Sequence, residues 1–492
     1  MSGTINSMAS APMTRTKTSR QNGKQSGSAA QSRSVLRSSL MASAGLLLVI
    51  AAPFLAPVKI AAQSFSQTPA AASSKIFAIT NAKIYTLAGP VIENGTVVIR
   101  DGKIAAVGAG VAAPADAQVI DAKGLEVYPG LFDPITGMGL GEVDQVLSTQ
   151  DTAETGDYNP DVVAATAVNP SSAHIPVTRA AGITHVLSVE GVGGLDSQSG
   201  AGLLAGQASA INLAGWTMAD MAIDKSVAMA VYWPSITTNE FDFATFTFKT
   251  KPYAEAKEAY DRQINELADW LDRARHYAQA VDKGAPADYE RDLKLEALIP
   301  VVQGRKPLLV FADTARDIRN SVEFFSKQNL KMILAGGAEA WEEKTLLKQK
   351  NVPVILDPTM RLPDEEDFPY DKPMTQPAEL VAAGVPIAFA SFNTDFSRRL
   401  TQQAGNAVAY GLSRDEALKA VTLNAAKMFG LDDRLGTIEP GKMANLIVTD
   451  GDVLELRTQL RYLFIQGQLT SLDNKHLQLY EMYRKRPKPS AP

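Results

Sequence analysis

Residues 129–432 alternate short apolar runs with helical patterns, and this alternation restricts the fold more than any other feature of the chain. The predicted strands include "GITHVLSVEG", "SVAMAVYWP", "KPLLVFAD", "LKMILAGG", "VPVILDP" and "VPIAFASFN". Repeated strand–helix units over about 300 residues predict a parallel α/β fold. At this length a (β/α)8 TIM-type barrel is expected rather than an open sheet.

Two helices are predicted most clearly in this region. Residues 254–281 carry apolar side chains three and four positions apart on one face: Ile264, Leu267, Leu271, Ala274 and Ala278. Residues 413–430 begin with Ser413, followed three positions later by Glu416, which is the spacing of a capping box. They end at Gly430, a residue type that commonly terminates helices.

Two β-rich segments flank the predicted barrel. Residues 76–128 contain Val- and Ile-rich runs on either side of Asp101-Gly102, a dipeptide that supplies the positive φ angles of a tight hairpin. Residues 433–470 return to the same pattern. Neither segment is long enough for a good core alone. We therefore expect one small composite β-sandwich built from both ends of the chain, followed by a loose tail at residues 471–492.

Residues 1–75 are predicted to be a flexible leader outside the fold. A basic segment precedes the uncharged run "LMASAGLLLVIAAPFLAPV" at residues 40–58, and small residues follow it. This order is typical of a secretory signal. A retained membrane anchor and a buried core helix are the alternatives, although Pro53 and Pro57 disfavour a continuous spanning helix. We expect the folded part to be exported to the periplasm, or to the outer face of the inner membrane, of a bacterial-type cell.

Composition excludes several kinds of site. The net charge of −5 gives no indication of nucleic acid as a partner. The chain has no cysteine, which excludes disulfides, thiolate metal sites and a cysteine nucleophile. Its histidines are His174, His185, His276 and His476. Any histidine-bound metal centre would have to be built from these four.

Several segments resemble, in the right order, the opening and closing motifs of the amidohydrolase superfamily. They are "AITNAKIYT", "NGTVVIRDGKIAAVG", "VIDAKGLEVYPGLFD" and "LGTIEPGKMANLIVTDGD". In addition, "SRDEALKAVTLNAAKMFGL" is similar to the family's last barrel helix. A barrel bracketed by a two-part β-sandwich is the layout of this superfamily. The chain looks most like the imidazolonepropionase-like branch, and the resemblance covers residues 76–468.

The resemblance implies a hydrolase of non-peptide C–N bonds in amides or cyclic amides. In the family the first barrel strand ends in Asp-x-His-x-His, two more histidines follow on later strands, and an aspartate near the last strand binds metal and accepts the proton of water. Two imidazoles two residues apart on a strand face the same side and can share one metal. The metal lowers the pKa of bound water to about 7, so hydroxide forms at neutral pH.

The ligand positions that the resemblance implies are occupied by other residue types. The stretch "YPGLFDPITGMGL" keeps the family's aspartate as Asp133, and the replacements elsewhere are Ile135, Gly137, Phe311, Gly336 and Phe392. Asp395 lies three residues beyond the last of these positions. Replacement on several strands together predicts that the metal site is absent. Zinc is expected only if the family mechanism operates here.

The four histidines are not predicted to rebuild the site, because no two of them have ligand spacing. His185 lies early in a strand, whereas barrel chemistry takes place at the carboxyl ends, so it is predicted to pack or to form hydrogen bonds. His276 lies off the apolar stripe of its helix and is predicted to be solvated. His174 is expected near a helix start with a structural role, and His476 lies in the tail.

Eight polar residues are predicted at or just beyond strand ends, at the mouth of the barrel: Asp133, Thr136, Asp313, Arg316, Asp317, Asp357, Asn393 and Asp395. One interpretation is a pocket for a polar ligand, or for Ca²⁺ or Mg²⁺ held by carboxylates. The candidate ligand-binding residues are then Asp133, Thr136, Asp357 and Asn393. The other interpretation is that they cap helices and satisfy loop backbone, as expected for Asp313 and Thr314.

Three functions from different classes remain open. The first is the family's C–N hydrolysis, which the missing ligands predict to be degenerate and metal-free in this chain. The second is a binding protein or a partner subunit of an intact amidohydrolase, as part of a homo- or hetero-oligomer. The third is a hydrolase that uses carboxylates or another metal, with Asp133, Asp357 and Asp395. The sequence does not identify the catalytic residues; Asp133 and Asp395 are candidates, and Asp133 is also expected to shape the mouth.

Overall fold

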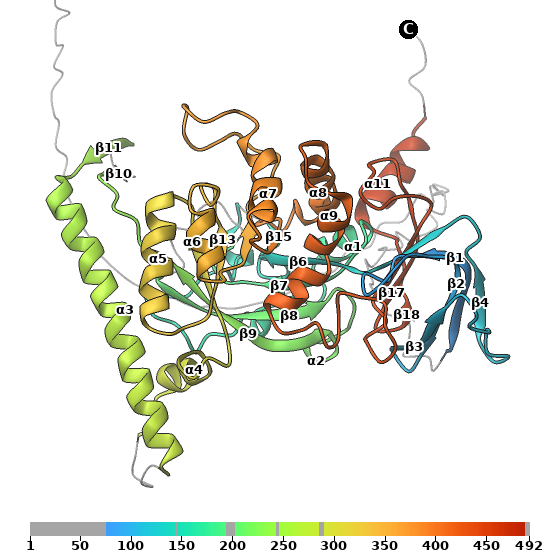
Figure 1. Cartoon of the computed structure of the whole chain (residues 1–492), viewed down its shortest axis with the longest axis horizontal. Helices are drawn as coiled ribbons and strands as arrows, with labels where there is room; N and C mark the ends of the chain where they lie inside the picture. Colours follow the sequence, from blue (N-terminus) through green and yellow to red (C-terminus); the bar gives the residue numbers. More distant parts are fainter. Residues whose placement is uncertain (1–74, 144, 193–201, 243–245, 285–289, 488–492) are drawn as a thin grey trace, which may run out of the picture. The chain divides into compact units, whose positions relative to one another are not determined.

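A computed structural model describes residues 75–143, 145–192, 202–242, 246–284 and 290–487 (Figure 1). The predicted signal or anchor at residues 40–58 lies outside the described residues. Among the helices within these ranges, none combines the length and the apolar character needed to cross a bilayer.

The predicted TIM-type barrel is confirmed. Its sheet has the order β15-β14-β13-β12-β9-β8-β7-β6. The segment after β15 returns to β6, because Phe392 N donates a hydrogen bond to Ile135 O at 3.0 Å. The eight strands are β6 (Leu131–Thr136), β7 (Ile183–Ser188), β8 (Leu204–Asn212), β9 (Ala222–Tyr232), β12 (Leu308–Ala312), β13 (Met332–Gly336), β14 (Val354–Leu356) and β15 (Ile387–Phe389).

The barrel departs from the expected all-parallel arrangement at one strand. β8 runs antiparallel to both of its neighbours, β7 and β9. Nine residues, 213–221, link β8 to β9, fewer than the dozen or more that a crossover between parallel neighbours needs. Its sequence, "LAGQASAIN", consists mainly of small and polar residues with Ile211 as its one β-branched residue, so it was not predicted.

The helices of the described residues are distributed around the barrel (Figure 1). They are α1 (His174–Arg179), α2 (Met218–Met221), α3 (Tyr253–Asp282), α4 (Leu293–Val302), α5 (Ala315–Lys327), α6 (Lys344–Gln349), α7 (Lys372–Ala382), α8 (Leu400–Ala409), α9 (Arg414–Ala420), α10 (Leu423–Met428) and α11 (Lys475–Arg484), with short 3-10 turns at η1 (Leu147–Thr149), η2 (Ala164–Thr166) and η3 (Ser397–Arg399).

The prediction for α3 agrees with the structure, the prediction for the region of α9 and α10 agrees in part, and the tail differs from expectation. The apolar stripe of α3 is buried at Leu267, Leu271, Ala274 and Ala278. Ser413 caps α9 as predicted, but the expected single helix is divided into α9 and α10. The tail expected to be loose contains α11, whose side chains are mostly exposed.

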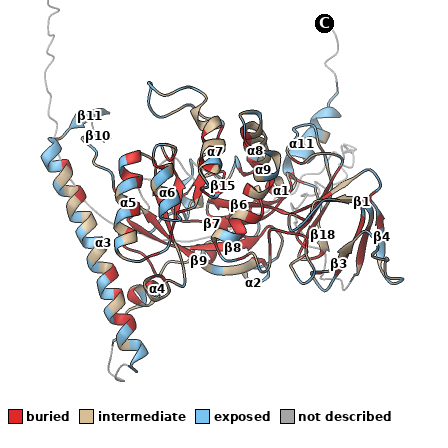
Figure 2. Cartoon of the chain, viewed as in Figure 1, coloured by how far each residue is buried: buried red, intermediate tan, exposed pale blue. Residues whose placement is uncertain are grey.

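The barrel strands are largely buried (Figure 2), and they separate two apolar layers. Alternate residues of β12 fall into different clusters: Leu308 and Val310 pack in the outer layer with α5, and Leu309 and Phe311 pack in the interior. This is the period of two that strands impose on side chains. Phe429, just after α10, also belongs to the interior cluster, so α10 lies against the interior at the amino ends of the strands.

Strands from both ends of the chain share a second sheet of eight strands. β5 pairs antiparallel with β16, which joins the amino-terminal and carboxy-terminal sets. Its members are β1 (Phe77–Ile84), β2 (Ile92–Arg100), β3 (Lys103–Gly108), β4 (Gln118–Asp121), β5 (Glu126–Pro129), β16 (Leu446–Thr449), β17 (Leu460–Ile465) and β18 (Gln468–Leu469). A separate hairpin is formed by β10 (Asn239–Asp242) and β11 (Thr247–Thr250).

The predicted hairpin turn joins β2 and β3. Asp101 has φ 51° and Gly102 has φ 77°, the positive pair that such a turn requires. The pairing of Arg100 with Lys103 across the turn confirms the prediction.

Candidate functional site

The first and last strands of the barrel meet through Asp133. This residue lies in β6 and is fully buried. Ser391 N donates to its Oδ1 at 3.0 Å, and Ser397 Oγ donates to its Oδ2 at 2.6 Å. Both carboxylate oxygens are therefore engaged by the segment that follows β15, and Asp133 helps to close the barrel.

Burial raises the pKa of Asp133 to about 6, while the hydrogen bonds from Ser391, Ser397 and the main chain at Ile135 lower it. Desolvation penalises a carboxylate because water no longer surrounds its charge. The surrounding donors keep the ionised form accessible near neutral pH.

Hydrocarbon side chains occupy two of the family's ligand positions inside the barrel. Ile135 is fully buried and Phe311 is 7 % exposed, and both belong to the interior cluster. The ring of Phe311 stacks on Tyr232 with centroids 4.3 Å apart, and its centroid lies 6.2 Å from that of Phe392 in an edge-on arrangement. Aromatic pairs of this geometry stabilise a core beyond simple area burial.

Two glycines, Gly137 and Gly336, occupy further ligand positions, and neighbouring atoms leave little space for a side chain at either one. A Cβ atom at Gly137 would lie 2.2 Å from Val192 O, and one at Gly336 would lie 2.3 Å from Asp313 Oδ1. Gly336 also has φ +88°, a conformation that residues with side chains rarely adopt. A histidine at either position would therefore require the surroundings to move.

These residues do not fit the metal that the family implies. Zinc needs nitrogen, sulfur or oxygen donors, and isoleucine, glycine and phenylalanine side chains offer none. In the part of the chain that the structure describes, no group of three or more His, Asp or Glu side chains is arranged to hold a metal ion. We derive no step through a metal at this position.

A second polar cluster lies beyond the ends of β12 and β14. Arg361 forms an ion pair with Asp357 and another with Asp364, the latter at 2.5 Å. Burial raises the pKa of both Asp313 and Asp357, and the proximity of Asp313 raises the pKa of Asp357 further. Asp357, Arg361 and Asp364 line a crevice of ≈ 20 Å³, which has room for little more than a water molecule.

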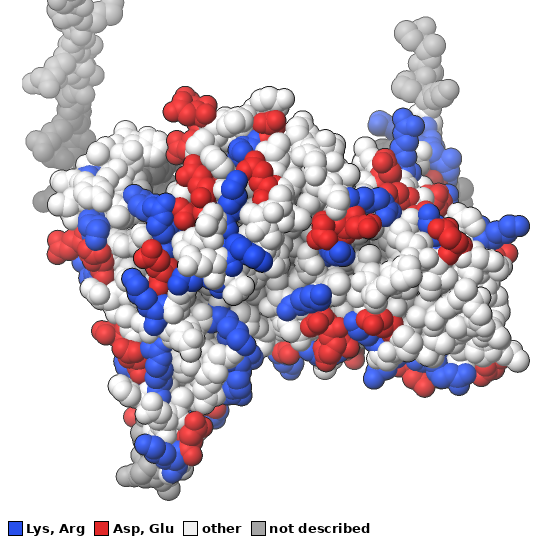
Figure 3. Space-filling view, viewed as in Figure 1, with Lys and Arg blue, Asp and Glu red and all other residues white. Residues whose placement is uncertain are grey.

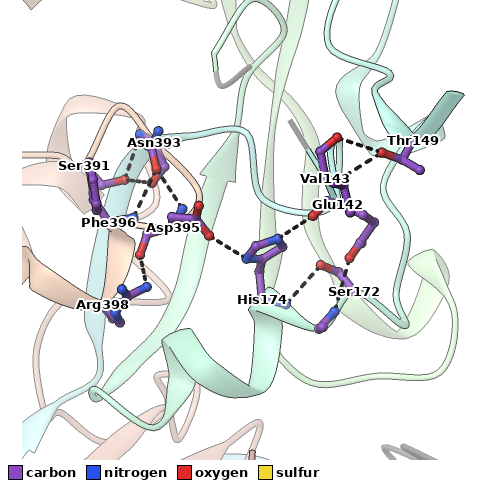
Figure 4. A network of polar contacts seen from close by, with 11 residues as sticks. Glu142, Val143, Thr149, Ser172, His174, Ser391, Asn393, Asp395, Phe396 and Arg398 are labelled. Atoms are coloured by element: carbon purple, nitrogen blue, oxygen red, sulfur yellow. Dashed lines mark hydrogen bonds and ion pairs between the residues drawn. The ribbon is translucent and has the colours of Figure 1, made fainter. Parts of the chain in front are cut away.

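The loop after β15 is organised by its own polar residues (Figure 4). Asn393 Oδ1 accepts hydrogen bonds from Asp395 N at 2.8 Å and Phe396 N at 3.1 Å. The Asp395 carboxylate lies 3.1 Å from Nδ1 of His174, whose Nε2 lies 3.1 Å from Glu142 O. His174 thus links the loops that follow β6 and β15, at the start of α1 as predicted.

The remaining histidines lie away from the mouth. His185 is buried in β7, with Nδ1 2.7 Å from Thr184 Oγ1, and burial lowers its pKa to about 3. It is therefore a neutral, packed residue, as its strand position predicts. His276 and His476 are exposed on α3 and α11.

Several predicted mouth residues have structural partners. Thr314 caps α5, because its Oγ1 accepts a hydrogen bond from Asp317 N at 3.2 Å. The buried Asp317 carboxylate accepts a hydrogen bond from Ser235 Oγ at 2.8 Å and lies 3.4 Å from Arg316. Thr136 Oγ1 is buried with no hydrogen-bond partner among the described residues.

Sequence reasoning missed four residues of these clusters. Arg361 and Asp364 follow a strand in a segment with no helical period, so their spacing from Asp357 carried no information. Ser391 and Ser397 lie in "SFNTDFS", where a serine gives no sign of its distant partner Asp133. Charged and polar residues near a strand end could have indicated that these two segments belong to the site. They could not have indicated which residues form hydrogen bonds or ion pairs with one another.

We predict that replacing Asp133 by asparagine changes the pH dependence of stability. The folded-state pKa of about 6 lies above the unfolded value of 3.8, so the folded state binds more protons between these values. The wild type should therefore lose about 2 kcal/mol relative to Asp133→Asn as pH rises from 4 to 7. Urea unfolding across this range measures it, with the exposed Asp269→Asn as control. Parallel curves for wild type and Asp133→Asn would contradict the account.

We also predict that Gly137→Ala destabilises the protein by roughly 1–3 kcal/mol, because the added methyl group meets the Val192 carbonyl. The matched control is Gly110→Ala, where a Cβ atom would have no neighbour within 4 Å. Thermal unfolding of the two variants and the wild type checks it. Equal melting temperatures for the two variants would mean that this ligand position is open.

Known proteins resemble the chain in sequence and in fold. Residues 377–474 match the model of the Amidohydrolase family. An imidazolonepropionase of Caldanaerobacter subterraneus is 25% identical over 381 residues, covering 74% of this chain and 86% of that protein. The imidazolonepropionase of Deinococcus deserti is 25% identical over 372 residues, covering 72% and 85%.

The fold has a solved counterpart. The crystal structure of an amidohydrolase from Thermotoga maritima aligns with a TM-score of 0.67 and 24% identity, covering 80% of this chain and 99% of that one. The barrel, the second sheet built from both ends of the chain, and these matches agree. The chain is therefore similar in sequence to imidazolonepropionases and has the fold of an amidohydrolase.

Proposed function

We propose that this chain keeps the amidohydrolase fold without metal-dependent hydrolysis and acts as a non-catalytic partner of a metal-containing amidohydrolase. By relationship it stands among hydrolases of C–N bonds. The observation that carries the proposal is the hydrocarbon packing at the ligand positions, where Ile135 and Phe311 fill the interior that the donors would face. A lone aspartate without a metal has little means of making hydroxide.

The polar residues that remain support the same conclusion. Both carboxylate oxygens of Asp133 accept hydrogen bonds, from Ser391 and Ser397. The side-chain oxygen of Asn393 accepts a hydrogen bond within its own loop. The crevice beside Asp357 is too small for an amide substrate, because small-molecule pockets commonly occupy about 300–1,000 Å³. These side chains hold the mouth together.

Exposed apolar side chains at the mouth support a partner role. Leu147 is 86% exposed in the loop after β6, and Leu362 and Tyr370 are 78% and 71% exposed in the loop after β14. Large apolar side chains left in water are costly, and groups of them commonly mark protein-binding surfaces. Both loops follow the carboxyl ends of barrel strands.

The absence of hydrolysis is the first expectation. The purified protein, with or without added zinc, should convert imidazolone propionate and simple cyclic amides no faster than buffer, while an intact imidazolonepropionase assayed in parallel should be active. Zinc-dependent turnover that co-elutes with the protein would contradict the proposal. Metal-independent turnover that falls at least about 100-fold in Asp357→Asn, but not in Asp364→Asn, would instead support carboxylate chemistry at Asp313 and Asp357.

The partner role has its own test. Each intact amidohydrolase paralogue from the same organism is co-purified with the protein and with the variant Leu147→Ser/Leu362→Ser. We expect one paralogue to bind the wild type and to be lost from the variant. The control variant Leu293→Ser/Leu456→Ser removes exposed leucines elsewhere and should still bind. Failure of every paralogue to bind, or equal binding to both variants, would contradict the role.

A further inference from the structure

A large pocket lies at the opposite end of the barrel from the mouth. Its volume is ≈ 690 Å³, within the range of small-molecule sites. Its walls come from the segments that enter β12, β13 and β14, from the start of β9 and from the end of α10. In barrels of this type the amino ends of the strands usually serve stability, and catalysis takes place at the other end. A pocket of this size here therefore calls for a separate explanation.

The pocket is strongly basic. Five cationic side chains line it, one or two from each entering segment: Arg305, Lys306, Lys331, Lys350 and Lys427. Figure 3 shows Lys and Arg side chains on this face below α5 and α6. The carboxylate among the lining residues is Asp224, which lies 3.8 Å from Arg434 and accepts a hydrogen bond from Ser226 N at 3.0 Å.

The five cations have no acidic partner in the described part of the chain, since no carboxylate there lies within 4.0 Å of any of them. Four of them are exposed, and Lys306 is half-buried. Like charges around one concave surface repel one another and focus a positive potential into the space between them. An anion in the pocket would relieve this repulsion.

Lys306 shows that the pocket is more than a group of surface lysines. Its Nζ donates to Ser226 Oγ at 2.5 Å, and Ser226 in turn bonds to Gln207. Burial lowers the pKa of Lys306, because its ammonium group has lost part of its water. A neutral hydroxyl replaces that water only in part, so the ammonium remains able to bind an anion.

The rest of the wall is apolar. Leu330, Met332 and Ile333 at the start of β13, together with Met428 and Phe429 after α10, complete the lining. Cationic side chains at the rim and apolar side chains along the wall would together bind an organic molecule that carries an anionic group. Five positive charges against one carboxylate, that of Asp224, suit an anion with several charges. Lysine recognises phosphate as a point charge, without demanding a fixed geometry.

We propose that this pocket binds a small organic molecule carrying two or more phosphate groups. The site is independent of the proposed function, because it shares no residue with the barrel mouth. It gives the chain a ligand-binding role at the end of the barrel away from the former metal position.

The test is titration calorimetry of the purified protein with adenosine diphosphate, pyrophosphate and inorganic phosphate at low and high salt. We expect saturable binding with one site, tightest for the diphosphates and weakened by salt. The variant Lys331→Gln/Lys350→Gln/Lys427→Gln should weaken pyrophosphate binding at least about tenfold, because three of five charges are lost.

A matched variant removes the effect of net charge. Lys123→Gln/Arg262→Gln/Lys475→Gln deletes three exposed cations elsewhere and should bind as the wild type does. Circular dichroism and melting temperatures of both triple variants establish that they fold. Equal weakening in both triple variants, or no saturable binding of any phosphate, would overturn the proposal. Binding confined to phosphatidylglycerol vesicles or to DNA would also overturn it, because a polyanionic surface would then be the ligand.

Discussion

Hydrophobic packing of the barrel interior is the interaction on which the rest of the structure depends. Alternate residues of β12 to β15 point inward and meet Ile135 from β6 and the segment after α10. Each large apolar side chain fully buried in this way contributes roughly 1.5–3 kcal/mol relative to exposure. Ile135 and Phe311, at two of the positions where the family resemblance implies metal ligands, belong to this same interior. Their hydrocarbon side chains therefore add to the core.

At the mouth, aspartate and histidine side chains, which are common in catalytic sites, stabilise the fold. Asp133 joins the first strand to the segment after the last, and His174 with Asp395 joins two mouth loops. Asp133 is fully buried, so loss of its donors would leave a buried polar group without a partner, whereas Asp395 in the second pair is exposed. The opposite end of the barrel has the reverse character, with several unpaired cations around a large pocket. The two ends thus differ in character: exposed apolar side chains lie in the loops at the mouth, and cationic side chains line the pocket at the base.

Much of the fold was predictable because local patterns agree with it. The period of the apolar residues identifies six barrel strands and α3, and Asp101-Gly102 identifies its hairpin. β8 was missed because small residues give a strand no distinctive pattern, and its antiparallel direction depends on the length of its links. At the site, sequence alone identified what the ligand positions lack. It could not identify Ser391 and Ser397 as the donors to Asp133, because residues more than 250 positions apart meet only in the folded barrel. The basic pocket was missed for the same reason.

The central claim is that hydrocarbon packing has replaced the metal site of the family. The metal content of the purified protein, measured by elemental analysis after gel filtration without chelator, tests it most directly. The account predicts less than about a tenth of a zinc ion per chain, since the ligand positions offer no donor atoms. About one or two zinc ions per chain would contradict it, because zinc at that level requires a set of donors that the described barrel does not bring together.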